Sequence, residues 1–440
     1  MARQLDRTSR RNILRAGGAV GTAGLAAMAG CAGDQEQPLG NYPIDGDTVG
    51  YGFNGPLSGI LAADGEQQRD GFELAIDHLN NGGGLVDHID DLSGDGVLDY
   101  EVEGYTGDTE GDENVATDTL ERMIDRDEIM FFTGGISSSV EVASIPIAAD
   151  NHVVHGAVFS HTGEITGTDC GPYTFRSAMS ARTSAEALAE VLPELFGEDQ
   201  EFFQIYLDYA YGQSNRDHMQ ALMEDEGWTQ VGTSAIAYGE TDHETQINDL
   251  ASEEPDVLVF TSMGDAMASG LSQLADRGFE DLDVVVPLLS AFSMEPAGEA
   301  AEGVVGTANW HPSGGTDWSD DFTEAFEDEY GYTPGQAAME VYDACLHYSA
   351  AVEENGSFHP EEVAETLETF EWEYAMGEMG YRECDHQATR PAYVVEGVDE
   401  ETYEDTGIWL DLVEEIPGSE TEYSCDEEPA SNCEMPARED

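Results

Sequence analysis

The sequence has 440 residues, which is long enough for two domains, and its hydrophobic content of 40% permits folded cores. It contains 93 Asp and Glu residues but only 15 Lys and Arg residues. The resulting formal net charge of −78 argues against a nucleic-acid partner, because binding to phosphates requires basic patches. All of the Lys and Arg count is arginine, and the lack of lysine excludes a Walker-type ATPase, a Schiff-base enzyme and a Ser–Lys dyad. Since the apolar pattern described below indicates a folded protein, we interpret the acidity as a halophilic adaptation to molar salt, where the Debye length is about 3 Å.

The N-terminal segment has the features of an export signal. The paired arginines Arg10 and Arg11 precede a mildly apolar, Ala/Gly-rich run over residues 16–28, about half the length that a membrane-spanning helix needs. The run ends in Met-Ala-Gly before Cys31, which resembles a lipobox. We therefore expect residues 1–31 to be a twin-arginine signal peptide, with a lipid on Cys31 that holds the protein at the extracellular face of the cell membrane. A plain signal peptide with an incidental cysteine is the alternative.

Apolar strand-like segments alternate with amphipathic helical segments along most of the remaining chain. The strand-like segments are residues 48–53, 98–105, 129–133, 153–158, 202–207, 232–237, 257–261 and 284–289. Helical periodicity fills the intervals between them, and a further helix is predicted around residues 337–352. Strands that alternate with helices predict parallel sheets in an α/β fold. The amount of alternation suits two such doubly wound, Rossmann-like lobes, and the family resemblance given below implies that a hinge joins them.

The same pattern predicts how the chain is divided. It passes from a first lobe to a second and then returns once to each. The expected segments are a flexible tether over 32–46, lobe 1 over 47–178, lobe 2 over 179–307, a return to lobe 1 over 308–376, a return to lobe 2 over 377–415, and a C-terminal tail over 416–440.

The five cysteines beyond the signal segment are an odd number, so at least one is expected to be free. Cys425 and Cys433 are close in sequence and form one candidate disulfide, with Cys170 and Cys384 as a second candidate pair. Cys345 lies in an apolar helical stretch and is expected to be a buried thiol. No Cys-x-x-Cys sequence occurs, which argues against a structural zinc site.

Other metal and catalytic patterns fail on inspection. Residues 91–102 imitate the start of a calcium loop but lack the glutamate at its twelfth position. His152, His155 and His161 do not predict a metal site, because residues i and i+3 of a strand point to opposite faces. The serine run is Gly-x-Ser-x-Ser rather than the nucleophile elbow Gly-x-Ser-x-Gly. We therefore expect a protein that is not an enzyme and needs neither metal nor cofactor.

Several short sequences occur in a consistent order over roughly residues 47–400. They are Gly55-Pro56-Leu57-Ser58-Gly59, Asp70-Gly71 with Asn80-Asn81-Gly82-Gly83-Gly84, Gly135-Ile136-Ser137-Ser138-Ser139, Tyr173-Thr174-Phe175-Arg176, Asp208-Tyr209-Ala210-Tyr211-Gly212 and Cys384-Asp385-His386-Gln387. Together they resemble the leucine/isoleucine/valine-binding protein family, the type I solute receptors of ABC importers. The resemblance implies a monomer whose two lobes close on a small solute, such as an amino acid, and which then docks on ABC permease subunits.

Three consecutive serines form the first part of the candidate site. Ser137, Ser138 and Ser139 follow a buried strand and open a helix, where hydroxyls and free backbone N–H groups create an anion site. An ordinary serine N-cap is the alternative interpretation. The family resemblance implies that this turn receives the α-carboxylate of an amino acid.

The resemblance implies further contacts to the ligand. Ser160 and His161 fall where the family places additional hydrogen bonds, although a lone histidine is also an ordinary loop residue. Tyr211 matches the tyrosine of the second lobe that stacks over the ligand or hydrogen-bonds it, and a tyrosine of the lobe interface is the alternative. Asp64 falls where the family often has an aromatic residue at the pocket rim.

The partner of a ligand ammonium group departs from the family. The family usually supplies a carboxylate after the strand that corresponds to residues 284–289, but no acidic residue occurs here before Glu295. A buried ammonium group without a counter-charge is costly. Either Asp64 or Asp265 therefore replaces this acid, or the ligand is an amide, a urea or a carboxylate. A ligand-sensing receptor and an extracellular hydrolase remain as alternative functions.

Overall fold

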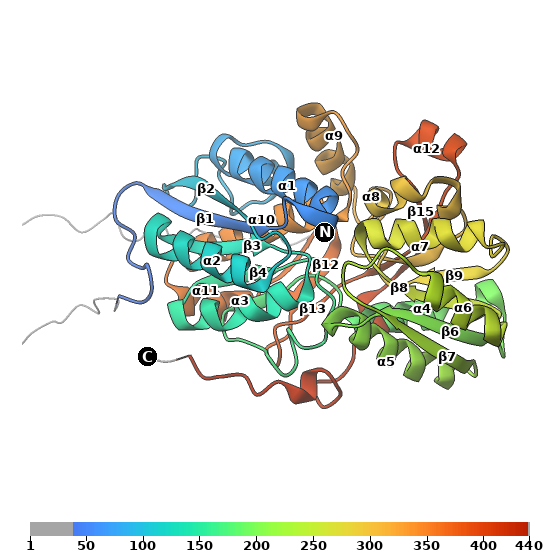
Figure 1. Cartoon of the computed structure of the whole chain (residues 1–440). Helices are drawn as coiled ribbons and strands as arrows, with labels where there is room; N and C mark the ends of the chain where they lie inside the picture. The colour runs from blue at the N-terminus through green and yellow to red at the C-terminus, as the bar shows by residue number, and fades with distance from the viewer. Residues whose placement is uncertain (1–37, 439–440) are drawn as a thin grey trace, which may run out of the picture. The chain divides into compact units, whose positions relative to one another are not determined.

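The computed structural model describes residues 38–438, and the predicted signal peptide with Cys31 lies outside them, as do residues 32–37 of the predicted tether. The prediction of a flexible tether is wrong for residues 38–46, because the side chain of Asn41 donates to the carbonyl oxygens of Ile124 and Ile129 in lobe 1. Lobe 1 is built on a parallel sheet of five strands in the order β2-β1-β3-β4-β5 (Figure 1). Its strands are β1 (Thr48–Gly55), β2 (Glu101–Asp108), β3 (Ile129–Gly134), β4 (Val154–Ala157) and β5 (Thr174–Arg176). The expected parallel α/β architecture is therefore confirmed for this lobe.

Helices cover both faces of the lobe 1 sheet, and neighbouring phenylalanines of β3 mark the two faces. Phe131 packs into the core formed with α1 (Ala62–Asn81) and α10 (Gln336–Asn355), whereas Phe132 packs into the core formed with α2 (Glu113–Asp127) and α3 (Ser138–Asn151). Two further helices of this lobe are α9 (Trp318–Tyr330) and α11 (Pro360–Leu367).

Lobe 2 repeats the doubly wound pattern in a sheet of seven strands in the order β15-β14-β10-β9-β8-β6-β7. The strands from β6 to β10 are parallel, and β14 and β15 are antiparallel. They are β6 (Glu201–Leu207), β7 (Thr229–Ile236), β8 (Val257–Thr261), β9 (Asp283–Val286), β10 (Val305–Ala308), β14 (Ala392–Gly397) and β15 (Leu410–Ile416).

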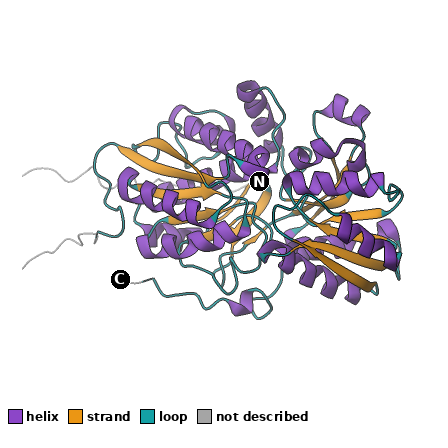
Figure 2. Ribbon diagram, in the orientation of Figure 1, coloured by secondary structure: helices purple, strands orange, loops and turns teal. Residues whose placement is uncertain are grey.

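Helices flank the strands of lobe 2 as they do in lobe 1 (Figure 2). One core lies between the sheet and the first two helices of the lobe, and another lies on the opposite face. The helices are α4 (Ala181–Phe196), α5 (Ala210–Asp225), α6 (Glu244–Glu253), α7 (Gly264–Asp276), α8 (Ala291–Met294) and α12 (Glu400–Thr406). Within residues 38–438, none of the helices has the length and apolar character needed to cross a membrane.

The chain crosses between the lobes after β5, after β10 and before β14. The last crossing differs from the boundary at residue 377 that the sequence suggested. Strand β12 (Gly377–Tyr381) instead pairs with β11 (Glu371–Tyr374) and β13 (Ala388–Thr389) in a small antiparallel sheet. Met376 and Met379 are buried in the lobe 1 core, so this sheet stays with lobe 1 and the crossing follows β13.

The disulfide pairs suggested by the sequence are wrong. The structure joins Cys170 to Cys433 and Cys384 to Cys425. Cys425 and Cys433 do not pair with each other because the tail passes along lobe 1 and brings each of them to a different lobe 1 cysteine. Cys345 is the free cysteine of the described chain, and its burial is confirmed.

Candidate ligand-binding site

In both sheets, the point at which the strand order reverses lies at the contact between the lobes. Strand order reverses between β1 and β3 in lobe 1 and between β6 and β8 in lobe 2. Open α/β sheets bind ligands outside the carboxyl ends of the strands at such reversals. Leu61, Ile136, Tyr211 and Met263 follow these four strands and belong to a single apolar cluster. The switch points of both lobes therefore meet in the structure.

A cavity of about 10 Å³ lies where they meet. Its wall is formed by Leu61, Asp64, Ile136, Phe159, Tyr211, Met263, Gly264, Met267, Leu288 and Ser290. This volume corresponds to about one water molecule. The lobes are thus closed against each other here, and a solute can enter only if they separate. The wall is mainly apolar, which suits a ligand with an apolar body.

Asp64 is the acidic residue of this wall and lies in the first turn of α1. Its side chain is only 3% exposed. The hydroxyl of Ser290, at the N-cap of α8 in lobe 2, donates a hydrogen bond to Oδ1 of Asp64. Asp265, the other acid that the sequence suggested, is exposed in the first turn of α7 and is absent from the wall among the described residues.

The three serines follow β3 and open α3, as the sequence predicted: Ser137 precedes the helix, and Ser138 and Ser139 are its first two residues. Ser137 occupies the N-cap position of α3, but its hydroxyl lies 3.4 Å from that of Ser139 instead of capping the helix. The hydroxyl of Ser138 is buried and has no hydrogen-bond partner among residues 38–438. Leaving a buried hydroxyl unpaired costs about 1–3 kcal/mol, so an acceptor atom of a ligand would be stabilised here.

The turn before the serines contains a glycine that lies against a buried pair of side chains, Glu141 and His155. Gly135 has φ +95°, and a Cβ at this position would lie 1.7 Å from Oε1 of Glu141. Glu141 in turn lies 2.8 Å from Nε2 of His155 on β4, and both side chains are buried. Burial raises the pKa of Glu141, and the contact with His155 opposes this rise. Sequence analysis missed this pair, because only the tertiary fold brings β4 beside α3.

Ser160 and His161 lie behind the cavity wall rather than in it. The hydroxyl of Ser160 donates to the carbonyl oxygen of Ile136 at 3.0 Å, which fixes the turn that leads to the serines. Nε2 of His161 lies 3.2 Å from Oδ1 of Asn309 in the second crossing. Burial lowers the pKa of His161 to about 3, so this histidine is neutral at ordinary pH.

Three tyrosines lie on the lobe 2 side of the site, and one of them lines the cavity. Tyr211 lines the cavity, is buried, and has a hydroxyl without a hydrogen-bond partner in the described part of the chain. Tyr209 packs edge to face against Tyr238, with 5.0 Å between the ring centroids. Tyr238, which follows β7, is hydrogen-bonded to the side chain of Ser137 in lobe 1. Sequence analysis missed Tyr238, because nothing in its local sequence indicates a contact across the lobes.

A buried arginine joins the three crossings behind the site. Arg390, in the third crossing, donates to the carbonyl oxygens of Ser177 in the first crossing and Asn309 in the second. Its Nη1 lies 3.8 Å from Oε1 of Glu340 on α10, and both side chains are fully buried. Burial raises the pKa of Glu340 to about 7, against the opposing effect of Arg390. The hinge is therefore a buried polar assembly.

Comparisons with known proteins agree with this architecture. The Leu/Ile/Val-binding protein homolog 8 of Brucella melitensis is 24% identical over 351 residues, which cover 76% of this chain and 83% of the relative. The Leu/Ile/Val-binding protein homolog 7 of Brucella abortus is 24% identical over 343 residues, which cover 74% of this chain and 82% of the relative. These relatives are matched over most of their length.

Solved structures show the same fold. A periplasmic binding protein from Burkholderia mallei superposes with a TM-score of 0.77 at 18% identity, covering 86% of this chain and 97% of the other. A leucine-binding protein from Thermotoga maritima gives 0.72 at 21% identity, covering 84% and 99%. A solute-binding protein of an ABC transporter from Rhodopseudomonas palustris, in complex with 3,4-dihydroxybenzoic acid, gives 0.72 at 19%, covering 85% and 98%. The model of the periplasmic binding protein family matches residues 48–402, and the chain therefore belongs to this family of solute-binding proteins.

Proposed function

We propose that this protein is the extracytoplasmic solute receptor of an ABC importer and that its cargo is a branched-chain or related amino acid. The observation that carries the choice of cargo is Asp64, a buried carboxylate in a wall that is otherwise mainly apolar. An ammonium group buried between the lobes needs such a counter-charge. A carboxylate has about four acceptor positions, so Asp64 can accept from Ser290 and from a ligand ammonium group together.

The remaining groups fit the rest of an amino acid. The hydroxyl of Ser138 and the backbone N–H groups at the start of α3 would receive the α-carboxylate. Leu61, Ile136 and Leu288 would surround an aliphatic side chain. The lobes would open to admit the solute and close around it by a hinge motion. The closed receptor would then dock on the permease subunits.

A ligand screen tests this cargo. Thermal unfolding would be followed in molar salt with leucine, isoleucine, valine, benzoate, a neutral amide and urea. A ligand present at 100 times its Kd adds about 2.7 kcal/mol to the free energy of unfolding. We expect the three amino acids to stabilise the protein. Stabilisation by the amide or urea alone would show that the proposed cargo class is wrong.

An aromatic carboxylate is the second candidate. The mainly apolar cavity and the neighbouring Tyr209, Tyr211 and Tyr238 would suit an aromatic ring, and Ser138 would suit its carboxylate. The relative from Rhodopseudomonas palustris carries a ligand of this kind. Against this candidate, the wall already contains the carboxyl group of Asp64, which would stand close to a second carboxylate. Stabilisation by benzoate and not by leucine in the same screen would favour it.

We further propose that the protein is exported by the twin-arginine route and anchored through a lipid on Cys31. The paired arginines Arg10 and Arg11 and the lipobox-like sequence before Cys31 support this. The variant Cys31→Ala should leave the membrane fraction and appear in the medium. Retention of this variant in the membrane fraction would refute the lipid anchor.

A further inference from the structure

The tail, defined here as residues 417–438, leaves lobe 2 but is covalently fixed to lobe 1. It begins directly after β15 and is joined to lobe 1 through Cys384–Cys425 and Cys170–Cys433. Cys384 follows β12 in the small sheet of lobe 1. Cys170 lies in the loop between β4 and β5 of the same lobe.

The disulfide Cys384–Cys425 closes a ring that contains part of lobe 2. Its two cysteines are 41 residues apart in sequence. The chain between them includes the third crossing, then β14 and β15, and finally the start of the tail. These two lobe 2 strands are thus attached to lobe 1 at both ends. The tail is therefore a fourth connection between the lobes, and a disulfide secures it.

Arginines from both lobes hold the tail between them. Arg182 on α4 of lobe 2 donates to the carbonyl oxygen of Glu428 at 2.7 Å and contacts the carboxylate of Glu427 at 3.2 Å. The same guanidinium lies 4.8 Å from the ring centroid of Tyr423, and that of Arg382, from lobe 1, lies 4.3 Å from it. Tyr423 thus contacts an arginine of each lobe.

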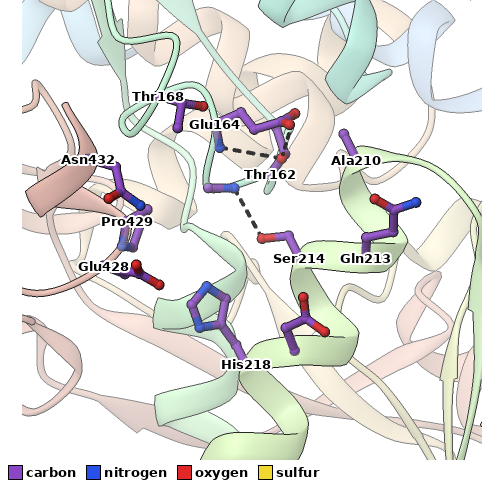
Figure 3. Close-up of a pocket in the computed structure, with 12 residues that line it drawn as sticks. Thr162, Glu164, Thr168, Ala210, Gln213, Ser214, His218, Glu428, Pro429 and Asn432 are labelled. Carbon is purple, nitrogen blue, oxygen red and sulfur yellow. Dashed lines mark hydrogen bonds between the residues drawn. The ribbon is translucent and has the colours of Figure 1, made fainter. Parts of the chain in front are cut away.

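The tail also lies beside a seam between the lobes, and Figure 3 shows the pocket there. The backbone N–H of Gly163 in lobe 1 donates to the hydroxyl of Ser214 on α5 of lobe 2 at 3.2 Å. Glu428, Pro429 and Asn432 of the tail form one side of a cavity of about 270 Å³ at this seam. If the lobes separate and α5 moves away from Gly163, α5 therefore also moves away from the tail.

We propose that the tail is a disulfide-anchored strap that limits how far the lobes open. The chain between Ile416 and Cys425 extends by at most about 3.5 Å per residue, and the disulfide at its end cannot yield. Molar salt screens exposed ion pairs such as Arg182–Glu427 but leaves covalent bonds intact. In molar salt, the disulfides therefore hold the tail to lobe 1 more strongly than the exposed ion pairs do.

Small-angle X-ray scattering of the ligand-free mature chain in molar salt tests this proposal. The double variant Cys384→Ser/Cys425→Ser should show a larger radius of gyration and a wider distance distribution than the wild type. Cys345→Ser is the matched control, because it removes a cysteine outside both disulfides, and it should scatter like the wild type. No ligand is used, so failure here is distinct from failure of the proposed cargo.

A second arm covers the case in which the double variant does not fold. Arg182→Ala keeps both disulfides and removes the hydrogen bonds of Arg182 to Glu427 and Glu428 of the tail, and it should widen the distance distribution to a smaller extent. Mild reduction of the folded wild type by a phosphine should widen the distance distribution more than Arg182→Ala does. Scattering curves that superpose on the wild type, from protein that circular dichroism shows to be folded, would overturn the proposal.

Discussion

The hydroxyl of Ser290 in lobe 2 donates a hydrogen bond to the carboxylate of Asp64 in lobe 1. This contact joins the two lobes in the wall of the small cavity where their switch points meet. Asp64, the proposed partner of a ligand ammonium group, therefore also accepts a hydrogen bond from the other lobe when the lobes are closed. If Asp64 binds the ligand as proposed, one side chain would couple ligand binding to lobe closure.

Replacing Asp64 by Asn should weaken leucine binding by roughly 2–5 kcal/mol, which is about 30-fold or more, because the ligand ammonium group would be buried without its counter-charge. Asp77→Asn on the exposed face of α1 is the matched control and should bind leucine like the wild type. Isothermal titration in molar salt measures both affinities. Equal affinities of Asp64→Asn and wild type would remove Asp64 from the site.

Replacing Ser138 by Ala should lower affinity for a carboxylate-bearing ligand by about 1–3 kcal/mol without lowering the free energy of unfolding. The reason is that the Ser138 hydroxyl is buried and unpaired among the described residues, so its loss removes no internal hydrogen bond. Ser144→Ala, on the same helix, removes a buried bond to the carbonyl oxygen of Val140 and should lower stability while leaving affinity unchanged. Denaturation curves and titrations separate the two effects, and the opposite pattern would make Ser138 a structural residue.

Replacing Tyr238 by Phe should raise the rate of ligand dissociation, because the variant loses the hydrogen bond to Ser137 that joins the lobes. Stopped-flow measurement of dissociation detects this change. Tyr206→Phe loses a bond to Arg216 within lobe 2 and serves as the control. An unchanged dissociation rate in Tyr238→Phe would mean that this tyrosine does not hold the closed form.

Glu340 predicts a pH dependence of stability. Burial raises its pKa from the ordinary value of 4.5 to about 7, so its contribution to the free energy of unfolding is fully present below about pH 4.5 and is lost as the pH rises through 7. The difference in unfolding free energy between wild type and Glu340→Gln should therefore shift against the wild type by about 3 kcal/mol between pH 4.5 and pH 8. The groups that face Glu340 are Arg390, Asn309 and the backbone of Phe159. Any effect of the titration of His161 is common to both proteins and cancels in the difference. A difference that is flat with pH would contradict this assignment.

The formal net charge of −78 predicts that the fold depends on salt. In dilute buffer the surface carboxylates repel one another, whereas molar salt screens them. Circular dichroism should therefore show loss of structure when the protein is diluted from molar to millimolar salt. A spectrum that is unchanged over this range would mean that the acidic surface is not an adaptation to salt.

The parts of the site that the sequence could predict are those that depend on local order along the chain. The three serines follow an apolar strand and open a helix, so their place at the end of a parallel strand follows from hydrophobic periodicity alone. Tyr211 opens the next comparable helix in lobe 2 and could be placed in the same way. The strand and helix alternation likewise indicated the doubly wound architecture.

The parts that the sequence could not predict depend on distant segments meeting. Cys170 finds Cys433 because the tail runs back along lobe 1, and separation in sequence carries no information about that path. Glu141 and His155 form a pair only once β4 lies beside α3. The choice of Asp64 over Asp265 required knowing which helix face turns toward the cavity.

The most direct test of the proposed cargo compares L-leucine with 4-methylpentanoate, which has the same carbon skeleton and carboxylate but no ammonium group. Both would be titrated into the wild-type protein in molar salt. The proposed pairing with Asp64 predicts that leucine binds with one site per chain and that 4-methylpentanoate binds at least about 30-fold more weakly. Equal or tighter binding of 4-methylpentanoate would contradict it.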